Sequence, residues 1–276
     1  MTARLADITA RIEGIRQLGA VVNAMKGIAS ARAHVARDQV TAVDSYAATL
    51  AAAMAQVIGA QAQVGTDTAD TPTGLLVFCA EQGFAGAFSE RVLDTIPADA
   101  PLFLIGTRGL SVAASRDITP DWHAALPSHS TGMPKLAEAI TTAIFAAMAK
   151  GDIGSLDVIH TSWEAGRPSV AQQTLLPLDL SALPAPSGAD VLTQLPRTAL
   201  IEGLSQDYLH ALITRAALHA FAAENEARMQ AMTAAGHQIE DELAVFEARL
   251  RHVRQSAITA EIIELGTGAA AAGPAR

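Results

Sequence analysis

The residues with the clearest chemical potential lie in the segment EQGFAGAF, residues 81–88, which follows an apolar run. A strand, a glycine turn and a helix form the setting in which the pyrophosphate of a dinucleotide binds, and Gly83 and Gly86 would supply the turn. The segment lacks both the G-x-G-x-x-G pattern and the lysine and hydroxyl residue of a P-loop. A tight turn is therefore preferred over a phosphate site, and GTRG (residues 106–109) is a weaker candidate still.

Other patterns of catalytic or metal-binding residues are missing from the sequence. The eight histidines form no H-E-x-x-H motif and no paired ligand spacing, and no G-x-S-x-G elbow is present. Cys79, the only cysteine, sits within the apolar run LLVFCA, which excludes an intrachain disulfide and fits a reducing compartment. We expect no catalytic residue, no metal and no cofactor.

Charged residues cluster in the last third of the chain. Glu240, Asp241 and Glu242 are typical of a solvated helix face. The arginines Arg249, Arg251 and Arg254 follow them, where cations near a helix carboxyl end favour its dipole or bind a partner. Periodicity alone leaves both interpretations open.

Composition narrows the function class. The 276 residues are 50% hydrophobic and carry a net charge of −9, without the basic stripe that nucleic-acid binding requires. We therefore expect no nucleic-acid partner. The amino terminus lacks the apolar core of a cleavable signal, and no stretch approaches the roughly 20 apolar residues of a membrane span.

Prolines divide the chain into three segments. Eleven of the twelve fall between Pro72 and Pro196. Because an interior proline breaks a helix, residues 1–71 and 197–276 are predicted as long helical segments, and residues 72–196 as a compact domain with an exit linker.

The first helical segment has an apolar stripe that predicts one helix of about 55 residues, roughly 80 Å long at 1.5 Å per residue. Interior glycines weaken such a helix, so it needs a partner along its length. The stripe consists of Leu5, Ile8, Ile12, Ile15, Leu18, Val22, Met25, Val40, Val43, Tyr46 or Ala47, Leu50, Met54 and Val57.

The last segment supplies that partner, because its apolar residues alternate in steps of three and four. This heptad seam predicts a coiled coil, most simply an antiparallel one with the first helix. The seam consists of Met229, Met232, Gly236, Ile239, Leu243, Phe246, Leu250, Val253 and Ala257.

The middle segment alternates strands and helices, which predicts a small Rossmann-like α/β sheet and, with the two arms, a mostly α, α+β fold. Strands are expected at 75–80, 101–106 and 157–163, with a less certain one at 174–178. A helix is expected at 135–150, another after residue 88, and an exit linker at 180–192.

Both ends of the chain resemble the gamma subunit of F-type ATP synthases. The stretch RQSAITAEIIEL (254–265) with its Gly/Ala tail is similar to the carboxyl terminus of that family, and ENEARMQAMTAAGHQIEDEL (224–243) to the same helix upstream. RIEGIRQLGAVVNAMKGIASAR (11–32) follows the opening helix, and EQGFAGAF occupies the place of a glycine-rich turn.

The resemblance implies a non-catalytic central stalk, in which an antiparallel coil turns inside a hexameric ring of alpha and beta subunits. Ion flow through a membrane c-ring would drive that rotation, and the chain would be peripheral, at the cytoplasmic face of the bacterial inner membrane, with an epsilon subunit as a further partner. The family positions tied to the beta-subunit interface correspond here to Met25, Arg254, Gln255, Thr259 and Glu261. Solvation and capping of a surface helix are the alternative for these residues.

The sequence also departs from the family. Lysines usual in the stretch 18–25 are missing, the turn at 81–88 lacks its arginine and paired glycines, and the chain is unusually acidic. A second-operon form, coupled to sodium instead of protons, is one hypothesis. Two other functions stay open from the residues alone: a nucleotide-fold enzyme with a helical dimerisation stalk, and a non-rotary coiled-coil scaffold.

Overall fold

Two very long helices and a central sheet make up the computed structural model, which describes residues 2–58, 71–97, 99–164, 166–186 and 192–271. Helix α1 spans Thr2–Ile58 and helix α5 spans Arg197–Ala271. Between them lie β1 (Thr73–Phe78), α2 (Phe88–Leu93), β2 (Leu102–Ile105), α3 (Thr107–Ala114), β3 (Trp122–Ala124), η2 (Ser130–Gly132), α4 (Met133–Lys150), β4 (Ser155–Glu164), β5 (Arg167–Leu176) and η3 (Leu180–Ala182). The predicted fold class is confirmed.

The chain divides into two compact units, which we describe separately. The first contains residues 1–28 and 230–276, and the second contains residues 29–229. Within the described residues, no helix is long and apolar enough to cross a membrane. Residues 59–70, 187–191 of the predicted linker, and the tail after residue 271 lie outside the described residues.

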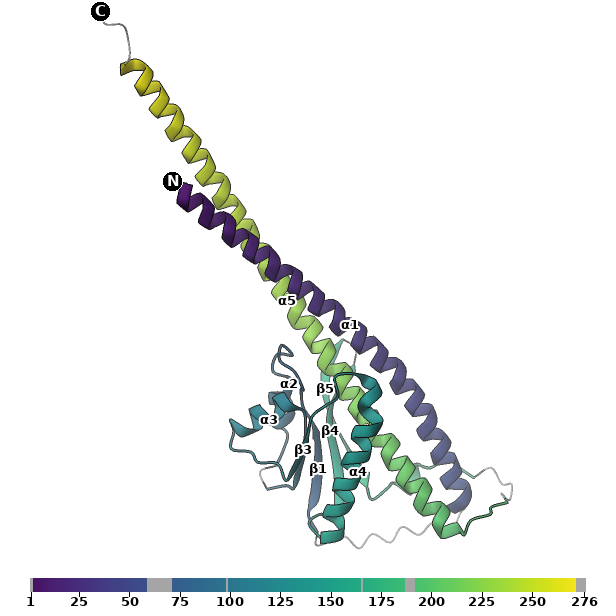
Figure 1. The fold of residues 1–276 in the computed structure, drawn as a ribbon. Coiled ribbons are helices and arrows are strands. Elements are labelled where there is room, and N and C mark those ends of the chain that lie inside the picture. Colours follow the sequence, from purple (N-terminus) through teal and green to yellow (C-terminus); the bar gives the residue numbers. More distant parts are fainter. Residues whose placement is uncertain (1, 59–70, 98, 165, 187–191, 272–276) are drawn as a thin grey trace, which may run out of the picture. The chain divides into compact units, whose positions relative to one another are not determined.

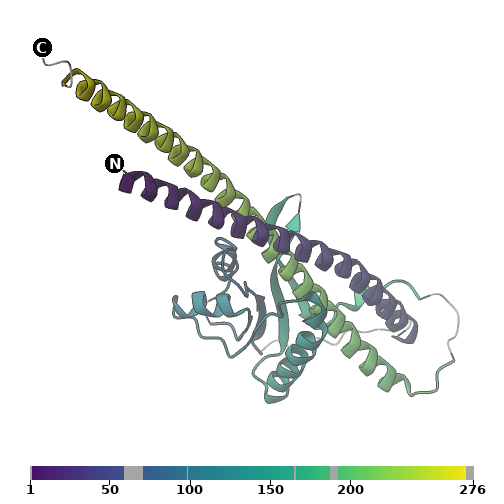
Figure 2. The ribbon, with the colours of Figure 1, turned by 45° about the horizontal axis from the view of Figure 1, so that its top comes forward.

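In the first unit the two helices run antiparallel. The Arg11 guanidinium lies 5.9 Å from the centre of the Phe246 ring, whereas a side chain at Gly19 would come within 3.3 Å of Ile239. A later residue of α1 therefore meets an earlier residue of α5. In Figures 1 and 2 the carboxyl end of α5 continues past the amino end of α1.

The heptad seam of α5 is confirmed, since Met232 is buried and the other seam residues are half-buried on a helix that is otherwise mostly exposed. The stripe of α1 needs one correction, because Leu18 is 54% exposed. Gly19 takes its place, so that Ile12, Ile15, Gly19 and Val22 step by three and four. This is the spacing that keeps one helix face on the seam.

The second unit holds a five-stranded sheet in the order β3-β2-β1-β4-β5. The strands β3, β2, β1 and β4 pair in parallel with one another, and β5 pairs antiparallel with β4. The three expected strands and the helix at 135–150 are confirmed, and the less certain strand is the end of the longer β5. Strand β3 and helix α3 were not predicted, because three and eight residues are too short for a clear period.

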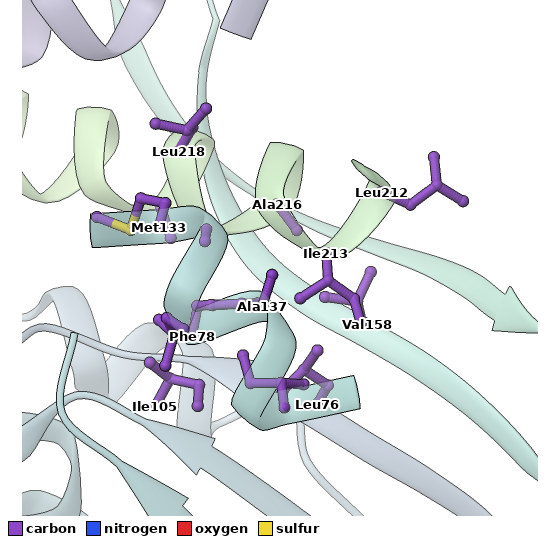
Figure 3. Close-up of a cluster of buried hydrophobic side chains, with 14 of the residues drawn as sticks. Leu76, Phe78, Ile105, Met133, Ala137, Val158, Leu212, Ile213, Ala216 and Leu218 are labelled. Carbon is purple, nitrogen blue, oxygen red and sulfur yellow. The ribbon is translucent and has the colours of Figure 1, made fainter. Parts of the chain in front are cut away.

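Helices cover both faces of this sheet (Figure 1). On one face, α4 and the first part of α5 enclose the largest core, in which Leu76, Phe78 and Ile105 of the sheet meet Met133 and Ile213 of the helices (Figure 3). On the other face, α2 and α3 cover a smaller core. The alternation of strands and helices thus gives a three-layer domain.

Helix α1 from residue 29 onward packs closely on α5 within this unit. Ala29, Ala33 and Ala36 of α1 are almost fully buried, and Ala47 and Leu50 share a buried cluster with Ala211 of α5. Ala47, not the exposed Tyr46, takes the alternative stripe position left open by the sequence. Small side chains allow the two helices to approach closely.

Candidate functional site

At the carboxyl edge of the sheet, where a nucleotide would bind in a Rossmann-like fold, the carboxylate of Glu81 binds the residues that follow β2 and β3. Glu81 Oε2 accepts hydrogen bonds from the backbone N–H groups of Thr107 (2.9 Å) and Leu126 (2.8 Å), and Oε1 accepts one from the Thr107 hydroxyl (2.8 Å). Thr107 follows β2 and Leu126 follows β3. The glycine segment thus supplies, through Glu81, an internal hydrogen-bond acceptor for the residues that follow β2 and β3.

The glycines of GTRG serve close packing. Gly106 has φ 111°, and a side chain there would come within 2.6 Å of the Cys79 carbonyl oxygen. A side chain at Gly109 would lie 2.0 Å from Cys79 Cβ. Cys79 is itself fully enclosed, and burial raises the pKa of its thiol to about 12, so it is not a nucleophile at neutral pH.

A buried polar network joins the turn at 81–84 to helix α5. The carboxylate of Glu224 accepts from the backbone N–H groups of Glu81 and Gln82, both at 3.1 Å. Arg228, one helical turn later, forms an ion pair with Glu224 and donates to the carbonyl oxygens of Gly83 (3.2 Å) and Gln82 (3.4 Å). We call Glu224, Asn225 and Arg228 the turn clamp.

Asn225 completes the turn clamp. Its side-chain oxygen accepts from Arg228 Nη1 (3.1 Å), and its amide nitrogen donates to the Phe221 carbonyl (2.8 Å). The adjacent Glu226 pairs with Arg37 of α1 at 2.6 Å. Sequence reasoning used ENEAR only as a family signature. The available signal was four polar residues, Glu224, Asn225, Glu226 and Arg228, within an otherwise apolar, alanine-rich stretch of helix.

The turn presents an exposed aromatic residue. Phe84 is 68% exposed and has φ 63°, the left-handed conformation that side chains rarely adopt. The hydrogen bonds of the turn clamp to the three preceding residues hold the chain in this conformation.

The five predicted subunit-contact residues all lie in the first unit. Met25 is half-buried on α1, and Arg254, Gln255, Thr259 and Glu261 are exposed on α5. The Thr259 hydroxyl bonds back to the Gln255 carbonyl within the helix (2.9 Å). The antiparallel register seen at Gly19 and Ile239 puts Met25 about 30 Å along the helix from Arg254, at 1.5 Å per residue. The structure therefore gathers four of the five residues and leaves Met25 apart.

Apolar side chains cover the same end of α5, and sequence reasoning missed them as a surface. They are 57–68% exposed, whereas apolar residues of this size are usually buried in a monomer. The surface consists of Ile258, Ile262, Ile263 and Leu265. Exposed apolar residues among the polar ones of this helix end are typical of a surface that meets a partner protein.

Two histidines meet between β4 and α5. His160 is buried, and its ring lies 5.5 Å from that of His219 in an edge-on arrangement. Burial, together with the nearby His219 ring, lowers the pKa of His160 to about 4, so it is neutral at physiological pH. The pair has the character of packed core histidines.

A family model described as ATP synthase matches residues 4–272. The chain is 27% identical over 288 residues to the ATP synthase gamma chain of Chlorobium luteolum, covering 96% of this chain and 97% of that protein. It is 28% identical over 285 residues to the ATP synthase gamma chain of Beutenbergia cavernae, covering 94% and 95%.

Solved structures agree on the fold. A chain in the rotor of the Euglena gracilis mitochondrial ATP synthase superposes with a TM-score of 0.63 at 12% identity, over 94% of this chain and all of that one. A chain in the central stalk and c-ring of the Tetrahymena thermophila mitochondrial ATP synthase gives a TM-score of 0.54 at 16% identity, over 78% of this chain and 99% of that one.

Proposed function

Since this chain belongs to the ATP synthase gamma family, we propose that its paired terminal helices turn inside a hexameric ring of alpha and beta subunits. The chain is a non-catalytic rotor subunit of the central stalk. The observation that carries the proposal is the match of the family model to residues 4–272, across both long helices and the sheet. The three segments 1–71, 72–196 and 197–276 would correspond to opening helix, docking domain and closing helix.

The mechanism is differential contact. A rotor can shift the conformational equilibrium of a catalytic subunit only through contacts that differ between its states. The exposed guanidinium and amide of Arg254 and Gln255 offer directional donors to a beta-subunit carboxylate or carbonyl. Thr259 and Glu261 would add contacts nearby, and Met25 one further along the shaft. The exposed apolar residues around them suit an enclosing ring.

Copurification tests the assignment. A tagged chain expressed with the alpha and beta subunits of its own cell should bring down both, with ATPase activity. Recovery of only a monomer or homodimer from cells making those subunits would overturn the rotor function and favour a scaffold or a separate enzyme.

A pair of variants tests the contact residues. Arg254→Ala combined with Gln255→Ala is expected to lower ATP hydrolysis of the assembled enzyme about tenfold, as for the loss of one buried charged contact. Arg249→Ala is the control, because it is exposed on the same helix about 140° away from Arg254 at 100° per residue. Equal effects of the two changes would show that Arg254 and Gln255 only solvate the helix.

The remaining partners are proposed for the docking domain. We infer that it meets an epsilon subunit and the membrane c-ring, and that the chain reaches the membrane, at the cytoplasmic face of the bacterial inner membrane, only through the complex. The described helices do not span a membrane, which agrees with attachment through partners. Loss of the chain from membranes from which the ring of alpha and beta subunits has been removed would support this attachment.

The coupling ion is a separate proposal. The acidic net charge of −9 and the missing lysines of the opening helix support a divergent, second-operon form that uses sodium. ATP hydrolysis by the purified whole enzyme should then respond to sodium at constant ionic strength. Hydrolysis insensitive to sodium would favour protons.

A further inference from the structure

Helix α5 is attached to the sheet of the second unit in two different ways. Between Leu209 and Ala222 it is held by apolar side chains in the large core, and Ala223 and Ala227 add a small apolar cluster with Ala85 and Phe88. At Glu224 and Arg228 it is held by the turn clamp. Apolar contact is non-directional, whereas hydrogen bonds weaken steeply when their angle or length changes. The two attachments therefore resist different motions.

We propose that Glu224 and Arg228 are positioning residues that lock α5 to the carboxyl edge of the sheet, so that torque reaching the docking domain enters α5 without slip. This inference rests on the rotary function proposed above. Helix α5 continues without a break from the clamp to Ala271. A motion of the sheet that the clamp passes on is thus passed to the same helix that carries Arg254 and Gln255.

The geometry explains why both residues are needed. Rotating α5 by one residue would swing the clamp side chains by about 100° around the helix axis, out of reach of the turn. Glu224 holds two backbone N–H groups, and Arg228 holds two backbone carbonyls of the same turn. The backbone donors and the backbone acceptors of the turn are therefore both bound by α5. A lysine ammonium at residue 228 would keep the charge but lose the planar fork that spans two carbonyls.

Arg228→Lys and Glu224→Gln test the proposal in the purified whole enzyme reconstituted into vesicles. The measurement is ions transported per ATP hydrolysed, for protons and for sodium, normalised to the amount of this chain assembled. A role limited to folding lowers the assembled amount and leaves that ratio unchanged. We expect the ratio to fall about threefold or more while hydrolysis persists, as for the loss of a charged hydrogen bond.

The matched control is Arg116→Lys. Arg116 pairs with Asp94 at 2.7 Å in the same unit, but this pair lies on the surface and does not touch the turn or α5. Its ratio should stay at the value of the unaltered enzyme. A ratio unchanged in assembled Arg228→Lys and Glu224→Gln overturns the clamp proposal alone, whereas failure of the unaltered chain to assemble overturns the rotary function.

A covalent bridge provides the second measurement. Gly83→Cys and Arg228→Cys would be joined by a short bis-maleimide before reconstitution, since a side chain at Gly83 meets open space. The native Cys79 stays unmodified because it is buried and its thiol pKa is about 12. The bridged, assembled enzyme is expected to regain the unaltered ratio to within about twofold, since a covalent link replaces the lost bonds. A low ratio in the bridged enzyme contradicts the proposal, even where Arg228→Lys itself fails to assemble.

Discussion

Two arginine–glutamate pairs on the long helices differ sharply in their surroundings. Arg228 and Glu224 in the second unit have side chains that are 6% and 2% exposed, whereas Arg16 and Glu247 in the first unit are 55% and 37% exposed. The first pair also binds four backbone groups of a neighbouring turn. The same helix α5 is therefore fastened by desolvated, directional bonds in one unit and by weak surface pairs in the other.

The apolar contacts follow the same division. In the second unit, helix α1 buries Ala33 and Ala36 completely, and α4 buries Ile140 and Ile144 completely. In the first unit most of the α5 seam is only half-buried, and the large apolar residues that follow it, Ile258 to Leu265, are exposed. The difference suits a unit that must hold its shape and a shaft whose surface must meet partners.

The largest expected effect comes from removing one member of the buried pair. Arg228→Ala leaves the Glu224 carboxylate buried without its cation, and we expect the free energy of unfolding to fall by about 3–5 kcal/mol. Urea unfolding followed by the fluorescence of Trp122 and Trp163, both in the second unit, measures it.

Arg16→Ala is the counterpart in the first unit. Because that pair is exposed, its loss is expected to lower stability by less than about 1 kcal/mol, and less at high salt. Unfolding followed by helical circular dichroism checks this value. Similar effects of the two changes would erase the contrast between the units.

Glycines give the next largest contrast, with opposite signs. Gly109→Ala forces a side chain to within 2.0 Å of Cys79 Cβ, so we expect a loss of about 2–3 kcal/mol. Gly14→Ala lies within α1 of the first unit, with nothing within 4 Å, and is expected to stabilise by about 0.5–1 kcal/mol. Melting temperatures of the two variants, compared with the unaltered chain, provide the measurement.

Acidification is expected to weaken the second unit selectively. The pKa of His160 is about 4 in the folded chain against 6.5 for a free histidine, so the unfolded state takes up a proton first as pH falls. The stability that depends on a neutral His160 is complete above pH 6.5 and is lost toward pH 4. We expect the free energy of unfolding to fall by about 2 kcal/mol between pH 7 and pH 5.

The variant His160→Gln should flatten that dependence, measured by urea unfolding at a series of pH values. An equal pH slope with and without His160 would assign the effect to another group.

The smallest effect concerns the register of the coil. Leu18→Gln alters an exposed side chain and is expected to change stability by no more than about 0.5 kcal/mol. Ile15→Ala at the buried neighbour should cost clearly more, about 2 kcal/mol. If thermal unfolding gave the reverse order, the seam would run through Leu18 as the plain apolar pattern suggests.

Long-range features were the easiest to predict from the sequence. The absence of proline before Pro72 and the heptad steps from Met229 identified both helices, because a long helix repeats its pattern many times. The apolar run 75–80 identified β1, because a parallel strand that is buried on both faces is apolar at consecutive residues. Leu18 was wrongly assigned to the buried stripe of α1. From Ile15 the stripe can continue three residues later, at Leu18, or four residues later, at Gly19, and only Leu18 is a large apolar residue.

Features that depend on tertiary contact could not be predicted. Strand β3 contains only Trp122, His123 and Ala124, and it becomes a strand by pairing with β2. The turn clamp required knowing that Glu224 lies beside Gln82, 142 residues earlier in the chain. Charge and sequence position contain no information on such a neighbour. The five predicted subunit-contact residues would depend on a partner outside the chain altogether.

The Glu81 carboxylate has a consequence for ligand binding at the sheet edge. It accepts hydrogen bonds from the backbone N–H groups of Thr107 and Leu126, so an external phosphate at these two groups would have to displace a side chain that is covalently tethered beside them. The chain thus occupies, with a side chain of its own, the N–H groups that follow β2 and β3.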